Sequence, residues 1–256
     1  MRTLAESILG DIDSIENSTD KYIAVERWCE SAKTGPGHNH QAGLFLDCNK
    51  AHYKINKDFT IDIDNINMWR RGDEIGPLPD YIQFNRAASV SVDGCQRVMS
   101  MKGWPKTVDG YLYISESPIR ACALADCTIE KVNTLTLYLT HFDGVKKMSE
   151  FPMDYERLTI SLPHGCHTRV PDFDKFSKDL KVLRLECLST CPNGTVDPRK
   201  LPQNLEHLYL EHCDLSNLDF PSGLKGIEVK YCHYRGHQIT AIEVSEHVSK
   251  SCNIIT

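Results

Sequence analysis

The sequence predicts an α/β solenoid: a curved parallel sheet built from one short strand per repeat, with a helical cap at the N-terminal end. Three observations predict this fold class. The segment LEHLYLEHCDLSNLDF, residues 205–220, has apolar residues at the spacing of a strand followed by an inward turn. Equivalent strands recur along the chain at nearly constant spacing. Short proline phrases occupy a similar place before several of them.

Seven pairs of apolar residues define the expected strands. The two members of a pair are separated by one outward-facing residue, as a strand with one buried face requires. The first members are 19 to 25 residues apart. A single unit of this kind cannot bury its apolar edge, so neighbouring units must stack on it. The pairs are Val90/Val92, Leu112/Ile114, Leu135/Leu137, Leu158/Ile160, Leu183/Leu185, Leu208/Leu210 and Ile227/Val229.

The chain ahead of these pairs is expected to hold the cap. Apolar residues fall on one helical face in residues 2–16 and again in residues 20–32, and Gly35-Pro36-Gly37 ends the second helix. The expected organisation is one elongated domain: helical cap 1–37, degenerate repeats or cap extension 38–86, repeats 87–235 and C-terminal cap 236–256.

Two further expectations concern the ends of the stack. The degenerate repeats would use the alternating pairs Leu44/Leu46 and Ile61/Ile63. At the other end, Ile239, Ile242 and Val244 would form a final capping strand.

The position three residues before each pair is mostly apolar, and Asp109 is the clear exception. The position three residues after each pair is expected at the inward turn, where a small polar or Cys side chain satisfies unpaired backbone groups. Five of the seven residues there fit, while Pro163 and Leu188 depart and predict irregular turns in the middle of the stack. The seven are Cys95, Ser117, Thr140, Pro163, Leu188, Cys213 and Cys232.

These motifs resemble the leucine-rich repeat over about Val132–Cys232. The phrases Leu201-Pro202-Gln203-Asn204-Leu205 and Phe220-Pro221-Ser222-Gly223-Leu224, with Phe151-Pro152, resemble the short repeats of bacterial effector proteins, whose return segments are extended because proline restrains the backbone. The resemblance implies a stand-alone bacterial or bacteriophage interaction protein that interferes with a host or defence protein. We expect no second domain of the kind that some of those effectors carry, so the resemblance does not imply ligase activity.

Charge, the first residues and the cysteines argue against several classes of protein. The net charge of −6 disfavours general nucleic-acid binding, which requires a basic surface. The first residues lack a basic start followed by an apolar run, so no secretory signal is expected, and no apolar stretch is long enough to cross a bilayer. The 11 cysteines are scattered and odd in number, which favours reduced thiols and a cytoplasmic location over a disulfide framework.

Cysteine and histidine clusters are weak metal candidates, because none has paired zinc-ligand spacing. We therefore expect no cofactor, no metal site and no catalytic residue. Cys166 beside His167 does not imply a nucleophile and base either, because adjacent residues of an extended chain point apart. The clusters considered are His38/His40/Cys48/His52, His164/Cys166/His167, Cys187/Cys191 and Cys232/His233.

Strand alternation predicts the interaction face. If Leu208 and Leu210 face inward, then His207, Tyr209 and Glu211 face the concave side of the sheet. The same offset applied to every strand brings tyrosine and arginine onto that face, and both are frequent in protein interfaces. Surface residues compatible with any strand remain the plain alternative. The expected partner-binding residues are Tyr111, Tyr113, Tyr138, Arg157, Arg184, Glu186, His207, Tyr209 and Glu211.

Three functions stay open from the sequence. The preferred one is a non-catalytic module that grips a specific protein, and so blocks or recruits it. The second is a structural subunit or homo-oligomer that uses the same face. The third is a metal-dependent protein or enzyme that uses the Cys/His loops.

Overall fold

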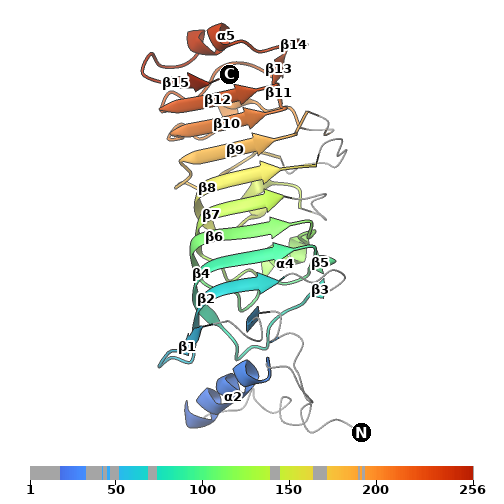
Figure 1. The fold of residues 1–256 in the computed structure, drawn as a ribbon, viewed down its shortest axis with the longest axis vertical. Coiled ribbons are helices and arrows are strands. Elements are labelled where there is room, and N and C mark those ends of the chain that lie inside the picture. Colours follow the sequence, from blue (N-terminus) through green and yellow to red (C-terminus); the bar gives the residue numbers. More distant parts are fainter. Residues whose placement is uncertain are drawn as a thin grey trace.

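The computed structural model describes residues 18–32, 42, 45–46, 52–68, 74–138, 145–163, 172–189, 191 and 194–255. These residues form a β-solenoid in which each turn adds one strand to a long ladder (Figure 1). The ladder is a ten-stranded sheet in the order β1-β2-β4-β6-β7-β8-β9-β10-β12-β15, and it is parallel except where β1 pairs antiparallel with β2. The order follows the chain, so each turn packs on the turn before it.

The parallel strands from β2 to β8 are longer than those from β9 to β15. Their bounds are β1 Tyr53–Ile55, β2 Ile61–Met68, β4 Phe84–Asp93, β6 Thr107–Ser115, β7 Lys131–Tyr138, β8 Asp154–Ser161, β9 Val182–Glu186, β10 His207–Glu211, β12 Gly226–Lys230 and β15 Asn253–Ile255.

The strand register confirms all seven expected pairs. Reading across β4, β6, β7, β8, β9, β10 and β12, the first members of the pairs are direct neighbours in the sheet. Every one of these side chains is at most 2% exposed. A shift by one residue would turn the whole apolar row to the outside, so burial and register support each other.

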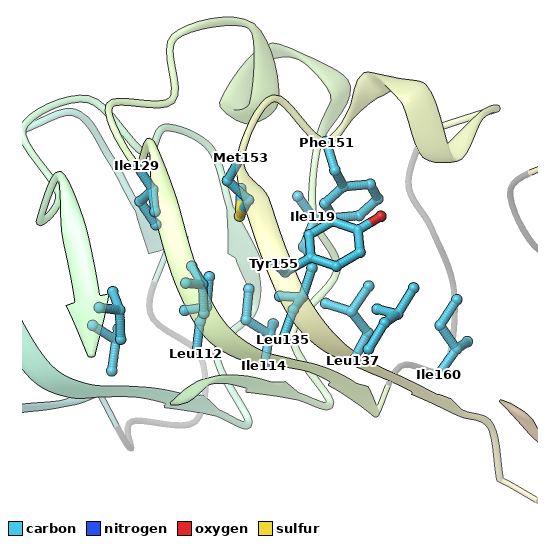
Figure 2. Packing of buried hydrophobic residues seen from close by; sticks show 14 of the residues in the cluster. Leu112, Ile114, Ile119, Ile129, Leu135, Leu137, Phe151, Met153, Tyr155 and Ile160 are labelled. Atoms are coloured by element: carbon cyan, nitrogen blue, oxygen red, sulfur yellow. The ribbon is translucent and has the colours of Figure 1, made fainter. Parts of the chain in front are cut away.

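The core lies between the sheet and the return segments. Figure 2 shows side chains from neighbouring strands, Leu112, Leu135 and Leu137 among them, pointing into one interior where Phe151 and Tyr155 also pack. Tyr155 is 1% exposed. Its burial raises the pKa of the phenol to about 12, so the ring remains neutral in the core.

Short β-bridges form a second wall beside the main ladder. β3 (Glu74–Ile75) pairs with β5 (Arg97–Val98), and β11 (Asp214–Leu215) pairs with β13 (His233–Tyr234), which is followed by β14 (His237–Gln238). Extended chain therefore also pairs between neighbouring turns outside the ten-stranded sheet.

The helical part of the α/β expectation is not supported in the described residues. After α2 (Ser18–Glu30) and the helical residues 42 and 45–46, the described chain carries only the short helices α4 (Ala121–Ala125) and α5 (Ala241–Glu246) and the 3-10 turns η2 (Met148–Glu150) and η3 (Pro198–Lys200). Proline explains the extended returns, since it removes a backbone donor and disfavours helix before it.

The proline phrases have a definite conformation. In both complete phrases the amide of the inward leucine donates to the carbonyl of the proline three residues earlier: Leu205 N to Pro202 O at 3.1 Å, and Leu224 N to Pro221 O at 3.4 Å. Each phrase is therefore a turn that delivers the next leucine to the core.

The inward turns carry hydrogen bonds between neighbouring repeats in two separate stretches. The amide of Cys95 donates to Ser117 Oγ at 2.9 Å. The amide of Cys213 lies 3.4 Å from Cys232 Sγ, and the Cys213 thiol donates to Leu185 O at 3.4 Å. The two stretches are the places where Cys or Ser occupies the turn, and Leu188, which has no polar side-chain atom, lies between them.

A β-bulge explains why Asp109 breaks the apolar pattern. Between the paired positions Val108 and Tyr111, strand β6 has one residue more than its partner β7. Val108 therefore takes the buried position, and Asp109 turns outward and forms an ion pair with Arg86. A bulge adds one residue to a strand and re-aims the side chains beside it. Gly110 occupies this bulge, where a Cβ atom would meet Ala88 O at 2.7 Å.

The bulge makes Gly110 a sensitive position. Gly110→Ala is expected to lower the free energy of unfolding by about 1–3 kcal/mol, because backbone atoms must move to admit the methyl group. Urea denaturation followed by circular dichroism measures the change. Gly76→Ala is the control, since its Cβ would meet nothing within 4 Å. Equal stability of the two variants would contradict the close approach at the bulge.

The two ends of the stack differ from the sequence expectations. Ile61 and Ile63 lie buried in β2, the first parallel strand, as expected, but the pair that aligns with Val90/Val92 is Ile66/Met68. Leu46 is buried in a short helical stretch, and Leu44 lies outside the described residues. The expected helix over residues 2–16 also lies outside them.

The expected capping strand with Ile239, Ile242 and Val244 is wrong. Ile242 and Val244 belong to α5, which begins with Thr240 accepting a hydrogen bond from the Glu243 amide while the Glu243 side chain accepts from the Thr240 amide. This reciprocal cap favours a helix start over a strand. The last strand is β15, which pairs with β12 through Ile254 and Ile227.

Candidate interaction face

The outward face of the sheet arranges the predicted site residues in three parallel columns. Tyr111 and Arg157 share the first column, with Thr134 between them and Val182 and His207 beyond. The second column runs Tyr113, Thr136, Thr159, Arg184, Tyr209 and Glu228. The third runs Ser115, Tyr138, Ser161, Glu186, Glu211 and Lys230. All nine predicted residues therefore lie on one face, as the strand period requires.

The large side chains of this face are solvent-accessible. Tyr111 is 47% exposed, Arg157 and Arg184 are exposed, and the remaining predicted residues are half-buried. Small residues beside the tyrosines are covered: Ser91 and Ser115 point to the same side, yet they are only 6% and 4% exposed. Rings and long side chains therefore make up most of the accessible surface.

The half of the face over β9, β10 and β12 is charged and internally paired. Arg184 forms an ion pair with Glu186 and lies 3.9 Å from Glu211, and its guanidinium is 5.9 Å from the centre of the Tyr209 ring. Lys230 pairs with Glu228. Two of these contacts join residues two apart on one strand, and Arg184–Glu211 joins neighbouring strands, where opposite charges stabilise a sheet.

The pKa directions agree with that pairing. The hydrogen bond to Glu186 raises the pKa of the Arg184 guanidinium, and the hydrogen bond to Glu228 raises the pKa of the Lys230 ammonium. Both cations are therefore held in their charged form at neutral pH.

The three columns continue over β7, β6, β4 and β2, and this half of the face is almost free of charge. It presents hydroxyl and amide side chains around three tyrosines, and Asp93 at its margin is the charged exception. Its members are Asn65, Asn67, Ser89, Ser91, Asp93, Tyr111, Tyr113, Ser115, Thr134, Thr136 and Tyr138. Tyr, Ser and Asn are the residue types that antibody-like binding surfaces favour.

Sequence reasoning missed Asn65 and Asn67, because it placed the first strand pair five residues too early. It also missed a hollow of about 400 Å³ at the corner where β1 folds onto β2, lined in part by His52, Lys54, Asp64, Arg86 and Asp109. The polar residue Asp109 at an expected apolar position was the signal that could have found the bulge beside this hollow.

Most of the Cys/His candidates lie outside the described residues, among them His38, His40, Cys48 and the 164–167 cluster. The nine cysteines within the described residues carry free thiols. The same part of the chain contains no group of three or more His, Cys, Asp or Glu side chains placed to hold a metal ion. Its helices also include none that is both long and apolar enough to span a membrane.

Comparison with known proteins identifies no relative: no family model, curated protein or solved structure matches this chain. The functional argument therefore depends on the geometry and chemistry of the outward face.

Proposed function

We propose that this chain is a leucine-rich-repeat-like protein that binds a specific protein through the outward face of its sheet and performs no catalysis. Three features support the kinship: the seven strand pairs in register, the Cys and Ser side chains at the inward turns, and the Leu/Phe-Pro-x-x-Leu turns. In this proposal the outward face is the concave one and the N-terminal helices close the stack.

The observation that carries the proposal is the convergence of the nine residues on one continuous face. They come from β6, β7, β8, β9 and β10, which are consecutive in the sheet, so the face spans roughly 20 Å at the usual strand spacing. Tyrosine and arginine bury large areas at interfaces and account for much of the binding energy there. Mixed and mutually paired charges suit a protein partner better than a polyanion.

The setting follows the resemblance to short-repeat effector and phage proteins. We propose a bacterial or infected-host cytoplasm, where the protein blocks or recruits a host or defence factor. Its free thiols are compatible with a reducing compartment.

Paired tyrosine variants test the face. Tyr111→Ala with Tyr113→Ala is expected to weaken capture of a partner from bacterial lysate at least about tenfold, because hot-spot truncations cost about 2 kcal/mol or more each. Immobilised wild type and variant are compared by quantitative mass spectrometry. Tyr22→Ala with Tyr231→Ala is the control, since both tyrosines are exposed and lie off the face.

Equal loss in the face and control variants, or retention in both, would contradict the proposed surface. Self-association through the same face is the competing arrangement. Sedimentation equilibrium of the wild type and the Tyr111→Ala/Tyr113→Ala variant separates the two: a dimer that dissociates on substitution would assign the face to a second copy of the chain.

A further inference from the structure

Arg157 differs from the other arginines of the outward face. Arg86 pairs with Asp109, Arg184 pairs with Glu186, and Lys230 pairs with Glu228. The exposed Arg157 side chain forms no ion pair or hydrogen bond with any other residue in the part of the chain that the structure describes. Glu156 precedes it in sequence, yet the two side chains do not form an ion pair.

The direct sheet neighbours of Arg157 are uncharged. Thr134 and Val182 are its direct neighbours on β7 and β9 in the first column. Thr159 follows Arg157 by two residues on the same side of β8. Thr136 on β7 is the neighbour of Thr159 in the second column. Tyr111 lies one strand beyond Thr134. A guanidinium with open donors thus lies in the middle of a patch of hydroxyl, aliphatic and aromatic side chains.

We propose that Arg157 is the anchor of this face and that it receives a carboxylate, an aspartate or glutamate side chain, from the protein partner. This inference rests on the proposed function, because it assigns the partner's chemistry at the same surface. The planar guanidinium forms two parallel hydrogen bonds to one carboxylate, and none of its donors is committed to another residue that the structure describes.

The threonines and Tyr111 would surround that ion pair. A rim of neutral contacts keeps water away from a central charged pair, which strengthens the pair and is typical of binding hot spots. Phosphate recognition commonly uses clusters of arginine, whereas a single unpaired guanidinium among threonines matches one carboxylate. The paired charges over β9, β10 and β12 add no net basic field that would favour a polyanion.

A displayed library of random peptides serves as the probe, selected separately on the full-length wild type, Arg157→Gln and Arg157→Glu. Wild type is expected to enrich peptides with Asp or Glu beside apolar or aromatic residues. Those peptides should bind Arg157→Gln roughly 30-fold or more weakly, because the partner's carboxylate loses its counter-charge on binding. Arg157→Glu should instead select Lys or Arg at the same place. Arg27→Gln, on α2, is the control for an exposed arginine off the face.

The outcomes separate the inference from the proposed function. Peptides that need Tyr111 and Tyr113 but bind Arg157→Gln as tightly as wild type would overturn the carboxylate anchor and leave the binding face in place. Selected peptides that depend on neither the tyrosines nor Arg157 would overturn both. Selection of phosphopeptides over their Asp and Glu counterparts from a phosphorylated library would replace the carboxylate with a phosphate. The exposed position of Arg157 leaves the fold of each variant intact, which circular dichroism verifies.

Discussion

The Leu208→Asp variant is expected to be unfolded at room temperature. Leu208 is fully buried and lies between Leu183 and Ile227 in the sheet. The change removes about 1.5–3 kcal/mol of apolar burial and places a carboxylate where no described partner compensates it, at a further cost of several kcal/mol. A domain with a stability of about 5–15 kcal/mol loses most or all of it. Far-UV circular dichroism and urea denaturation measure the loss.

Tyr209→Asp is the matched control for the same substitution one residue along the strand. Tyr209 lies on the outward face, half-buried, with the Arg184 guanidinium 5.9 Å from its ring. Water and Arg184 can solvate the new carboxylate, while Glu228 lies opposite it on β12, so the stability change should be about 1–2 kcal/mol, far below that of Leu208→Asp. If both variants unfold, or if neither does, the strand register of β10 is wrong.

The repeated strands were predictable because their signal is local and redundant. Alternation within Leu208–Leu210 sets which side chains are buried, and seven copies at similar spacing allow one alignment. A parallel ladder then requires equivalent residues to lie side by side. The three outward columns follow from the same alternation, so the position of the candidate face was predictable as well.

The departures from prediction occur where neighbouring turns decide the local structure. The bulge at Gly110 depends on the close approach of Ala88, which belongs to the previous turn. Strand β2 begins with Ile61, but its pairing with β4 places Ile63 beside Ala87 and Ile66 beside Val90. At the C-terminal end, the capping box of Thr240 and Glu243 outweighs the apolar pattern that suggested a strand.

Which charged side chains of the face contact one another also depends on how neighbouring turns are placed. Sequence offsets place Arg157, Arg184 and Glu211 on one side of the sheet without stating which of them meet. Only the structure distinguishes Arg184, which contacts acidic side chains on its own and the next strand, from Arg157, whose neighbours are threonine and valine. The candidate anchor was therefore found from contacts, although its place on the face was expected.

The N-terminal end of the stack provides the second large expected effect. Trp28→Ala is expected to lower the free energy of unfolding by about 3–5 kcal/mol, the usual cost of removing a buried tryptophan. Trp28 is 2% exposed and packs edge-on against Phe84, 6.3 Å between ring centres. Phe84 in turn stacks on Phe45 at 5.7 Å. Helix α2 is thus joined to the first turns of the solenoid through aromatic contacts, and urea denaturation measures what they contribute.

Hydrogen exchange shows where that loss is felt. A repeat stack is stabilised by contacts between neighbouring turns, so Trp28→Ala should speed exchange in β2 and β4 more than in β10 and β12. Trp28→Phe is the informative control: Trp28 Nε1 is buried and has no hydrogen-bond partner among the described residues, so a phenyl ring keeps most of the packing and removes an unsatisfied donor. Tyr22→Ala, on the exposed side of the same helix, should change little. Exchange that rises only within α2 would mean that this helix does not support the first strands.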